Sequence, residues 1–202
     1  MDFDKLTALA YEMMGQRKSH LRREVGFVYY HGQRTAKLVI TLRRAIFPDR
    51  AESDDVLVAA AMFHDVGKGM DPHSRYGALI AREALAGKGL MTDREVDDVT
   101  RIISVHEFRG DPTRPWDELL FQDADLLDHF GTYDLWMSVQ YQAHTDGSMG
   151  DMLTRYRDEY PEFLDEHRAL LNFDQTIAAY DARNRECGRI IARMAAENEG
   201  EM

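Results

Sequence analysis

The strongest candidates for chemistry in this chain are two adjacent residues, His64 and Asp65. They directly follow the apolar run 59–63. Burying an imidazole and a carboxylate beside apolar side chains is unfavourable unless a partner compensates them, and a metal ion does this well. Gly67, which permits a tight turn, and Lys68 follow the pair. The stretch therefore predicts a metal site next to a cation that can reach whatever the metal binds.

Further donors of the same kind occur along the chain, so that the full ordered set is His31, His64, Asp65, His73, His106 and Asp125. Imidazole nitrogen combined with carboxylate oxygen, without any thiolate, suits Mn²⁺, Fe²⁺, Co²⁺, Ni²⁺ or Zn²⁺. The sequence predicts a divalent transition metal, as one or two ions, and does not choose among these five metals.

This ordered series, H…HD…H…H…D, covers about half of the chain and resembles the HD superfamily of metal-dependent phosphohydrolases. The resemblance implies an all-α, single-domain helical bundle of the HD-domain type. It also implies that one metal is held by His31, His64, Asp65 and Asp125, and a second by His73, His106 and the bridging Asp65. If only one metal binds, His73 and His106 become candidates for a general acid or for substrate contact.

The resemblance implies hydrolysis of a phosphate ester in a small phosphorylated metabolite. Among such metabolites it favours a nucleotide. Two cations ~3.5–4 Å apart can share a hydroxide and neutralise charge on the phosphoryl group during attack. Asp65 is then the central catalytic residue, and Lys68 and Arg34 are predicted to bind phosphate oxygens. Monoester and diester cleavage both stay open. Two other functions stay open as well: a di-iron oxygenase of the same fold, and a non-catalytic module that binds a regulatory ligand.

The composition bounds the class of protein. The 202 residues, 44% of them hydrophobic, are enough for one buried core. A single domain over 1–202 is expected, with the metal-site core at about 26–130 and the C-terminal helices 131–197 packed on it. The net charge of −11 argues against general binding of nucleic acid. The single Cys187 excludes a disulfide within the chain, and no apolar stretch is long enough to span a membrane. The cytoplasm is the expected compartment.

Helical periodicity accounts for the segments that carry the donors. Apolar residues at three- and four-residue steps predict a helix from Asp2 to about Val25. Basic residues in its second half form either a solvated face or a phosphate-attracting edge of the pocket; they are Arg17, Lys18, His20, Arg22 and Arg23. Further helices are expected at 27–47, 54–63, 72–86, 93–106 and 116–129, with Thr92 as the cap of the helix at 93–106.

Two later segments complete the expected architecture. Glycine and proline make 108–115 a loop that could act as a lid or pocket wall. On the helix that follows it, Asp125 and Asp128 share a face, so Asp128 is a candidate outer partner or substrate-facing group. Beyond this helix the pattern predicts amphipathic helices at 152–171 and 173–196, whose aromatic residues indicate core packing or a homodimer.

Overall fold

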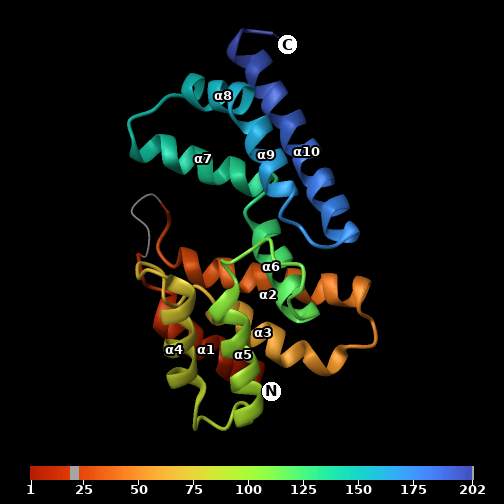
Figure 1. Ribbon diagram of the computed structural model, residues 1–202. Coiled ribbons are helices and arrows are strands. Elements are labelled where there is room, and N and C mark those ends of the chain that lie inside the picture. Colours follow the sequence, from red (N-terminus) through yellow and green to blue (C-terminus); the bar gives the residue numbers. More distant parts are fainter. Residues whose placement is uncertain (19–22, 202) are drawn as a thin grey trace. The chain divides into compact units, whose positions relative to one another are not determined.

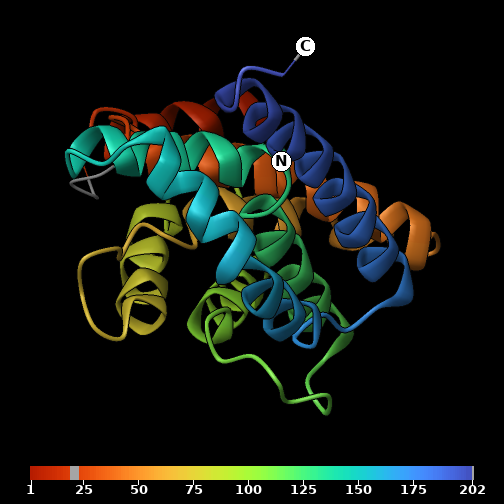
Figure 2. The same cartoon turned by 90° about the horizontal axis from the view of Figure 1, so that it is seen from above.

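The structure of this chain, a computed structural model, describes residues 1–18 and 23–201. The regular elements of these residues are helices, drawn from two sides in Figure 1 and Figure 2. Within the described ranges the one β-type interaction is an isolated bridge between Lys68 and Met70. The all-α prediction is therefore confirmed. The chain divides into two compact units, Met1–Asp128 and His129–Met202, which are described in turn.

The first unit contains every predicted donor residue. Its helices are α1 (Phe3–Met14), α2 (Phe27–Ile46), α3 (Asp54–Phe63), α4 (His73–Leu85), α5 (Asp93–Val105) and α6 (Trp116–Asp128), with a 3₁₀ turn η1 (Ala51–Ser53) before α3. Apolar residues at helical spacing face a shared core. Its fully buried members include Leu6, Val39, Leu57, Phe63, Ile102 and Phe121.

Local sequence explains where these helices begin and end. The Thr92 side chain accepts from the backbone N–H of Glu95, and the Glu95 carboxylate accepts from the backbone N–H of Thr92. This reciprocal pair confirms the predicted cap of α5. Gly26, at φ 76°, turns the chain into α2, and Pro48 follows the end of that helix.

The first helix is shorter than the sequence pattern predicts. α1 ends at Met14, and the predicted extension to about Val25 is wrong. Gly15 follows the last helical residue, and glycine has a low helix propensity. The segment beyond it also has few apolar side chains to bury, so little tertiary packing could extend the helix.

The basic residues that follow α1 are therefore not on a helix face where the structure describes them. The Arg17 guanidinium donates hydrogen bonds to the carbonyl oxygens of Val66 and Lys68. It thereby holds the turn that comes directly after the His-Asp pair. His20 and Arg22, predicted as part of the same basic group, lie outside the described residues.

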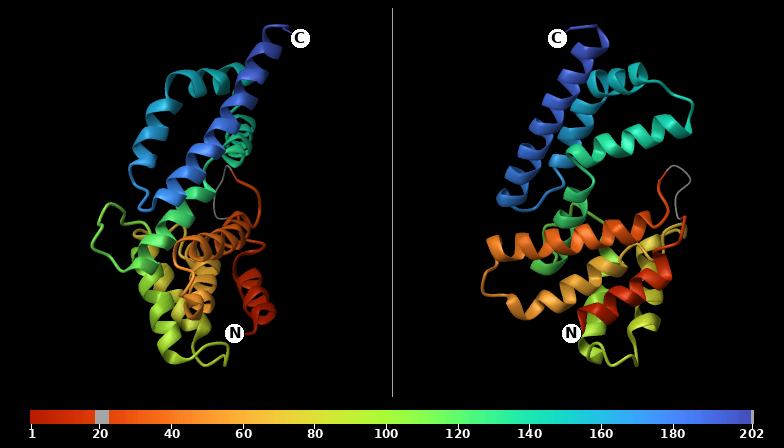
Figure 3. Two further views of the ribbon diagram at one scale, coloured as in Figure 1. Left: turned by 90° about the vertical axis from the view of Figure 1, so that its right-hand side faces the viewer. Right: turned by 180° about the vertical axis from the view of Figure 1, so that it is seen from behind.

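Close backbone contact brings the donor-bearing helices together. α2 lies beside α3, and α4 beside α5, as Figure 3 shows. A Cβ on Gly32 of α2 would lie 2.8 Å from the carbonyl oxygen of Ala61 in α3. A Cβ on Gly77 of α4 would lie 2.9 Å from the carbonyl oxygen of His64. Because atoms cannot pack this closely, only glycine permits these two approaches.

The second unit consists of α7 (Thr132–His144), α8 (Met149–Asp158), α9 (Tyr160–Arg168) and α10 (Asp174–Asn198). The single helix predicted at 152–171 is wrong, because the chain breaks at Glu159 into α8 and α9. Pro161 explains the break, since it has no N–H to donate and restricts the residue before it. The helix predicted at 173–196 is confirmed as α10.

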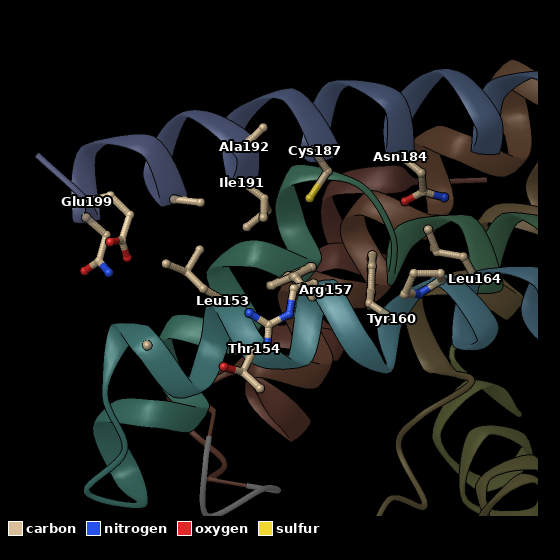
Figure 4. A pocket seen from close by; sticks show the side chains of 16 residues that line it. Leu153, Thr154, Arg157, Tyr160, Leu164, Asn184, Cys187, Ile191, Ala192 and Glu199 are labelled. Carbon is tan, nitrogen blue, oxygen red and sulfur yellow. The ribbon is translucent and has the colours of Figure 1, made fainter. Parts of the chain in front are cut away.

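α8, α9 and α10 line a cavity of about 660 Å³ within the second unit, shown in Figure 4. Its wall is mainly apolar and includes Leu153, Leu164, Cys187 and Ile191. None of the described residues that line it is a histidine or an aspartate, so the predicted donors have no part in this cavity.

Three predictions about the whole chain stay predictions: a single domain over 1–202, a homodimer and a cytoplasmic location. Across the ranges 1–18 and 23–201, no helix has both the length and the apolar character that crossing a membrane requires.

Candidate metal centre

Helices and their ends supply all of the predicted donors. His31 lies within α2 and Asp125 within α6, whereas His64 and Asp65 directly follow α3. His73 is the first residue of α4, and His106 directly follows α5. Five of the six donor residues are at most 5% exposed, and the sixth, His73, is partly buried. Side chains held this way have little freedom to move apart, which suits a site that needs fixed geometry.

The first group of donors joins α2, α3 and α6. Nε2 of His31 lies 3.0 Å from Nε2 of His64 and 3.0 Å from Oδ1 of Asp125. The same Asp125 oxygen lies 3.4 Å from Nε2 of His64, and Oδ1 of Asp65 lies 3.9 Å from that nitrogen. These atoms are close enough for His31, His64 and Asp65 to contact one ion, and Asp125 lies beside them.

The second group joins α3, α4 and α5. Nε2 of His73 lies 3.1 Å from Nε2 of His106. Oδ1 of Asp65 lies 3.3 Å from the first of these nitrogens and 3.8 Å from the second. Asp65, His73 and His106 therefore form a second group that could hold an ion. The same Asp65 oxygen faces both groups.

Backbone carbonyls fix two of the four imidazoles. Nδ1 of His64 donates to the carbonyl oxygen of Ala61 at 2.8 Å, and Nδ1 of His106 donates to that of Ile103 at 2.7 Å. Because a carbonyl oxygen only accepts, the Nδ1 atoms carry the protons. In the neutral rings Nε2 then presents a lone pair to the centre.

Carboxylates fix the other two imidazoles. Nδ1 of His31 lies 2.7 Å from Oδ2 of Asp128, and Nδ1 of His73 lies 2.8 Å from Oε2 of Glu107. A carboxylate behind an imidazole orients the ring and makes the opposite nitrogen a better ligand. The Asp128 prediction is supported by this contact, which places it as the outer partner of His31.

This arrangement fits divalent cations. In their metal-ligating, neutral form the rings of His31 and His64 would direct two lone pairs at each other across 3.0 Å, and those of His73 and His106 would do the same across 3.1 Å. Such lone pairs repel unless a proton or a cation lies at the centre. Together with the carboxylates, the nitrogen atoms form the mixed N and O donor set that transition metals prefer.

The pKa values of His31, His64 and Asp65 show how the carboxylates and imidazoles of the centre affect one another. Burial alone would lower the pKa of His31, but hydrogen bonds to Asp125 and Asp128 outweigh burial and raise the pKa to about 9. Burial lowers the pKa of His64, which keeps that ring neutral. Burial would raise the pKa of Asp65, yet the surrounding histidines and Lys68 hold it well below its usual range.

Two cations predicted from the sequence lie at this centre, with different partners. Nζ of Lys68 is 3.4 Å from Oδ1 of Asp65, and the lysine side chain is about one third exposed. The Arg34 guanidinium donates to Asp128 through Nε at 3.0 Å and Nη2 at 2.9 Å. Arg34 therefore holds the carboxylate that orients His31. The phosphate contacts predicted for Lys68 and Arg34 stay predictions.

Sequence reasoning missed Arg109, which lies in the loop 106–115. Its Nη2 is 2.5 Å from Oδ2 of Asp125, whereas Oδ1 of the same carboxylate contacts His31 and His64. Burial would raise the pKa of Asp125, but the charge of Arg109 and hydrogen bonds from His31 and His64 hold it well below its usual range. The expectation that 108–115 forms a pocket wall was the available signal, although it named no residue.

Glu107 was also missed as a member of the centre. Besides His73, it binds Ser74 through the backbone N–H at 3.2 Å and through the hydroxyl. It therefore ties the start of α4 to the end of α5. Its position directly after His106 was a signal, since residues adjacent to a ligand often orient the neighbouring one.

The histidines and aspartates that these helices and helix ends bring together define a helical protein with clusters able to hold a metal ion. The chain belongs to the HD domain family, whose model matches residues 28–132.

Solved structures share this fold over almost the whole chain. An HD-superfamily hydrolase from Bacillus thuringiensis is 18% identical with a TM-score of 0.66, covering 98% of this chain and 97% of that chain. A protein from Lactobacillus plantarum is 21% identical with a TM-score of 0.63, covering all of both chains. Bacillus subtilis YpgQ, crystallised in complex with ADP, is 17% identical with a TM-score of 0.65. The match covers 96% of this chain and 97% of that chain. A comparison with curated proteins finds no significant match.

Proposed function

We propose that this protein hydrolyses a phosphate ester in a small phosphorylated metabolite, using divalent metal ions. The observation that carries the proposal is the position of Asp65, whose Oδ1 lies 3.3 to 3.9 Å from Nε2 of three histidines. A carboxylate oxygen in this position can be shared by two ions. His31, His64 and Asp125 would complete one set of ligands, and His73 and His106 the other.

Two divalent ions, when bound, supply an activated water and positive charge for the phosphoryl group. The protein's own residues supply position and further charge. Asp128 and Glu107 keep the His31 and His73 rings turned toward the centre. We expect the Lys68 ammonium, which is partly exposed and lies beside Asp65, to bind a phosphate oxygen that enters from solvent.

A nucleotide is the substrate class that we favour. The support is that Bacillus subtilis YpgQ, which shares the fold, was crystallised in complex with ADP. Membership of the HD domain family supports a metal-dependent hydrolase. Whether a monoester or a diester is cleaved is left to experiment, so substrates of both kinds belong in the test.

The test is a screen of phosphate release and diester cleavage over nucleoside mono-, di- and triphosphates and cyclic nucleotides, with each of the five metals. Asp65→Ala is expected to lose activity while the far-ultraviolet circular dichroism keeps its helical signal. His144→Ala serves as the matched control, because His144 is not a predicted donor and its Nδ1 lies 2.8 Å from the carbonyl oxygen of Gln140 in its own helix. Activity that survives Asp65→Ala would refute the site.

Two other outcomes would identify the alternative functions. Iron-dependent oxygen uptake with an organic substrate, and no phosphate release, would favour the di-iron oxygenase. Ligand binding without turnover at any of the five metals would favour the regulatory module.

A further inference from the structure

Each of the three aspartates nearest the imidazoles has a basic partner. The carboxylates belong to residues no more than 5% exposed, so these contacts are weakly screened by solvent. The partners come from three different segments: the turn after α3, the loop 106–115, and α2. The ion pairs are Lys68–Asp65 at 3.4 Å, Arg109–Asp125 at 2.5 Å and Arg34–Asp128 at 2.9 Å.

Two further charged side chains of the described residues contact the centre or its turn. Glu107 binds Nδ1 of His73, and Arg17 binds the carbonyl oxygens of Val66 and Lys68. Imidazoles that ligate a metal are neutral. With the imidazoles neutral, as metal ligation requires, the four cationic and four anionic side chains of these contacts balance.

A divalent cation entering such a balanced centre leaves it with excess positive charge in a buried place. Excess charge of one sign is unfavourable where solvent cannot screen it. The excess is relieved when an anion binds beside the metal, and a phosphate group carries suitable negative charge. Lys68 and Arg109 therefore repel an incoming metal ion but attract the anion that would accompany it.

We infer that the Lys68–Asp65 and Arg109–Asp125 ion pairs couple metal binding to phosphate binding, so that each ligand strengthens the binding of the other. This inference rests on the proposed function for its choice of anion. Because linkage is reciprocal, phosphate must raise the affinity for metal by the same factor by which metal raises the affinity for phosphate.

Calorimetric titration of the full chain, freed of metal by a chelator, tests this coupling with Mn²⁺ and inorganic phosphate as probes. In the wild type, saturating phosphate is expected to tighten Mn²⁺ binding about tenfold, and saturating Mn²⁺ to tighten phosphate binding by the same factor. Arg109→Gln and Lys68→Gln each remove a repelling charge. Each variant should bind Mn²⁺ alone about threefold more tightly than the wild type, and should show a smaller effect of phosphate.

Arg114→Gln is the matched control, because Arg114 follows in the same connection between α5 and α6 and is buried to a similar degree. Its side chain is 20% exposed against 18% for Arg109, and it pairs with Glu118 and Asp111. It should leave both affinities unchanged. If Arg109→Gln does not fold, Lys68→Gln decides the question, since Lys68 is the more exposed of the two.

Two results would overturn the inference: equal Mn²⁺ affinity with and without phosphate in the wild type, or weaker Mn²⁺ binding in both variants. The second result would mean that these cations serve only to orient the aspartates. Turnover of a phosphate ester without coupling would reject the inference and keep the proposed function. Coupling without turnover of any ester would keep the inference and reject the proposed function.

Discussion

Nε2 of His73 lies 3.3 Å from Oδ1 of Asp65, which places the first residue of α4 against the carboxylate that follows α3. This contact decides whether the centre has one group of ligands or two. His73 brings His106 with it, since their Nε2 atoms are 3.1 Å apart. The second group therefore depends on how the short segment between α3 and α4 folds back.

Removing either histidine of this second group should leave the first group intact. We expect His73→Ala and His106→Ala each to reduce the metal content from two ions per chain to one, because His31, His64 and Asp65 remain. Elemental analysis of freshly purified protein gives the ratio, with His144→Ala as the control. Unchanged metal content in both variants would exclude the arrangement with two metals.

Asp128 offers a test of the carboxylate behind His31. Asp128→Asn removes the negative charge but keeps the shape of the side chain, so the His31 ring loses its charged partner. Metal affinity should fall by about 10- to 100-fold, as is usual for outer partners of ligating histidines. Calorimetric titration with Mn²⁺ measures the fall.

Arg34→Gln is the companion variant, because it leaves the Asp128 carboxylate in contact with His31 and removes only the cation that holds it. Metal binding should fall less than in Asp128→Asn. If Arg34 also contacts phosphate, its variant should raise KM more than it lowers kcat. A larger loss of metal affinity in Arg34→Gln than in Asp128→Asn would contradict the outer-partner role.

The six candidate donors could be named from the sequence because their residue types and order resemble those of the HD superfamily, and their binding of metal stays a prediction. Each donor also lies within a helix or directly at its end, and helical periodicity is a local property that sequence reveals. The ion pair between Arg109 and Asp125 could not be predicted in the same way. It depends on the path of the loop 106–115, which tertiary contacts determine rather than local propensity.

The errors in helix boundaries have local causes that the apolar pattern does not record. Periodicity alone extended the first helix past Gly15, although the apolar stripe ends at Met14. It also merged α8 and α9, where Pro161 removes a donor near the start of α9. Both cases show that glycine and proline had more influence on these boundaries than the spacing of apolar residues.

Alanine substitutions at Gly77 and Gly188 test whether close contact between helices contributes to stability. Gly77 and Gly188 are both helical, so alanine improves helix propensity by up to about 1 kcal/mol at each. At Gly188 a Cβ meets nothing within 4 Å, and the free energy of unfolding should rise. At Gly77 the Cβ would lie 2.9 Å from the His64 carbonyl oxygen, and stability should fall by about 1–3 kcal/mol. Urea unfolding compares the two, and a stabilised Gly77→Ala would show that the contact can relax.

Two helix caps provide a second matched pair. Thr92 and Ser53 both occupy the N-cap of a helix in the first unit, but only the Thr92 side chain makes the capping hydrogen bond. Thr92→Ala should lower the free energy of unfolding by about 1 kcal/mol. Ser53→Ala should change it by less than about 0.5 kcal/mol. Equal losses in urea unfolding would mean that the reciprocal bond with Glu95 contributes nothing.

Cys187 gives a prediction that depends on pH. Its side chain on α10 is fully buried, and burial, with a smaller effect of the Asp134 charge, raises the pKa of the thiol to about 11. Because the thiolate is the reactive form, a raised pKa leaves little of it at pH 8, and the reactive fraction should grow as the pH rises toward 11. A disulfide reagent should therefore label the folded protein slowly at pH 8 and label one thiol per chain rapidly in denaturant. Rapid labelling of the folded protein at pH 8 would show that the second unit opens at this cysteine.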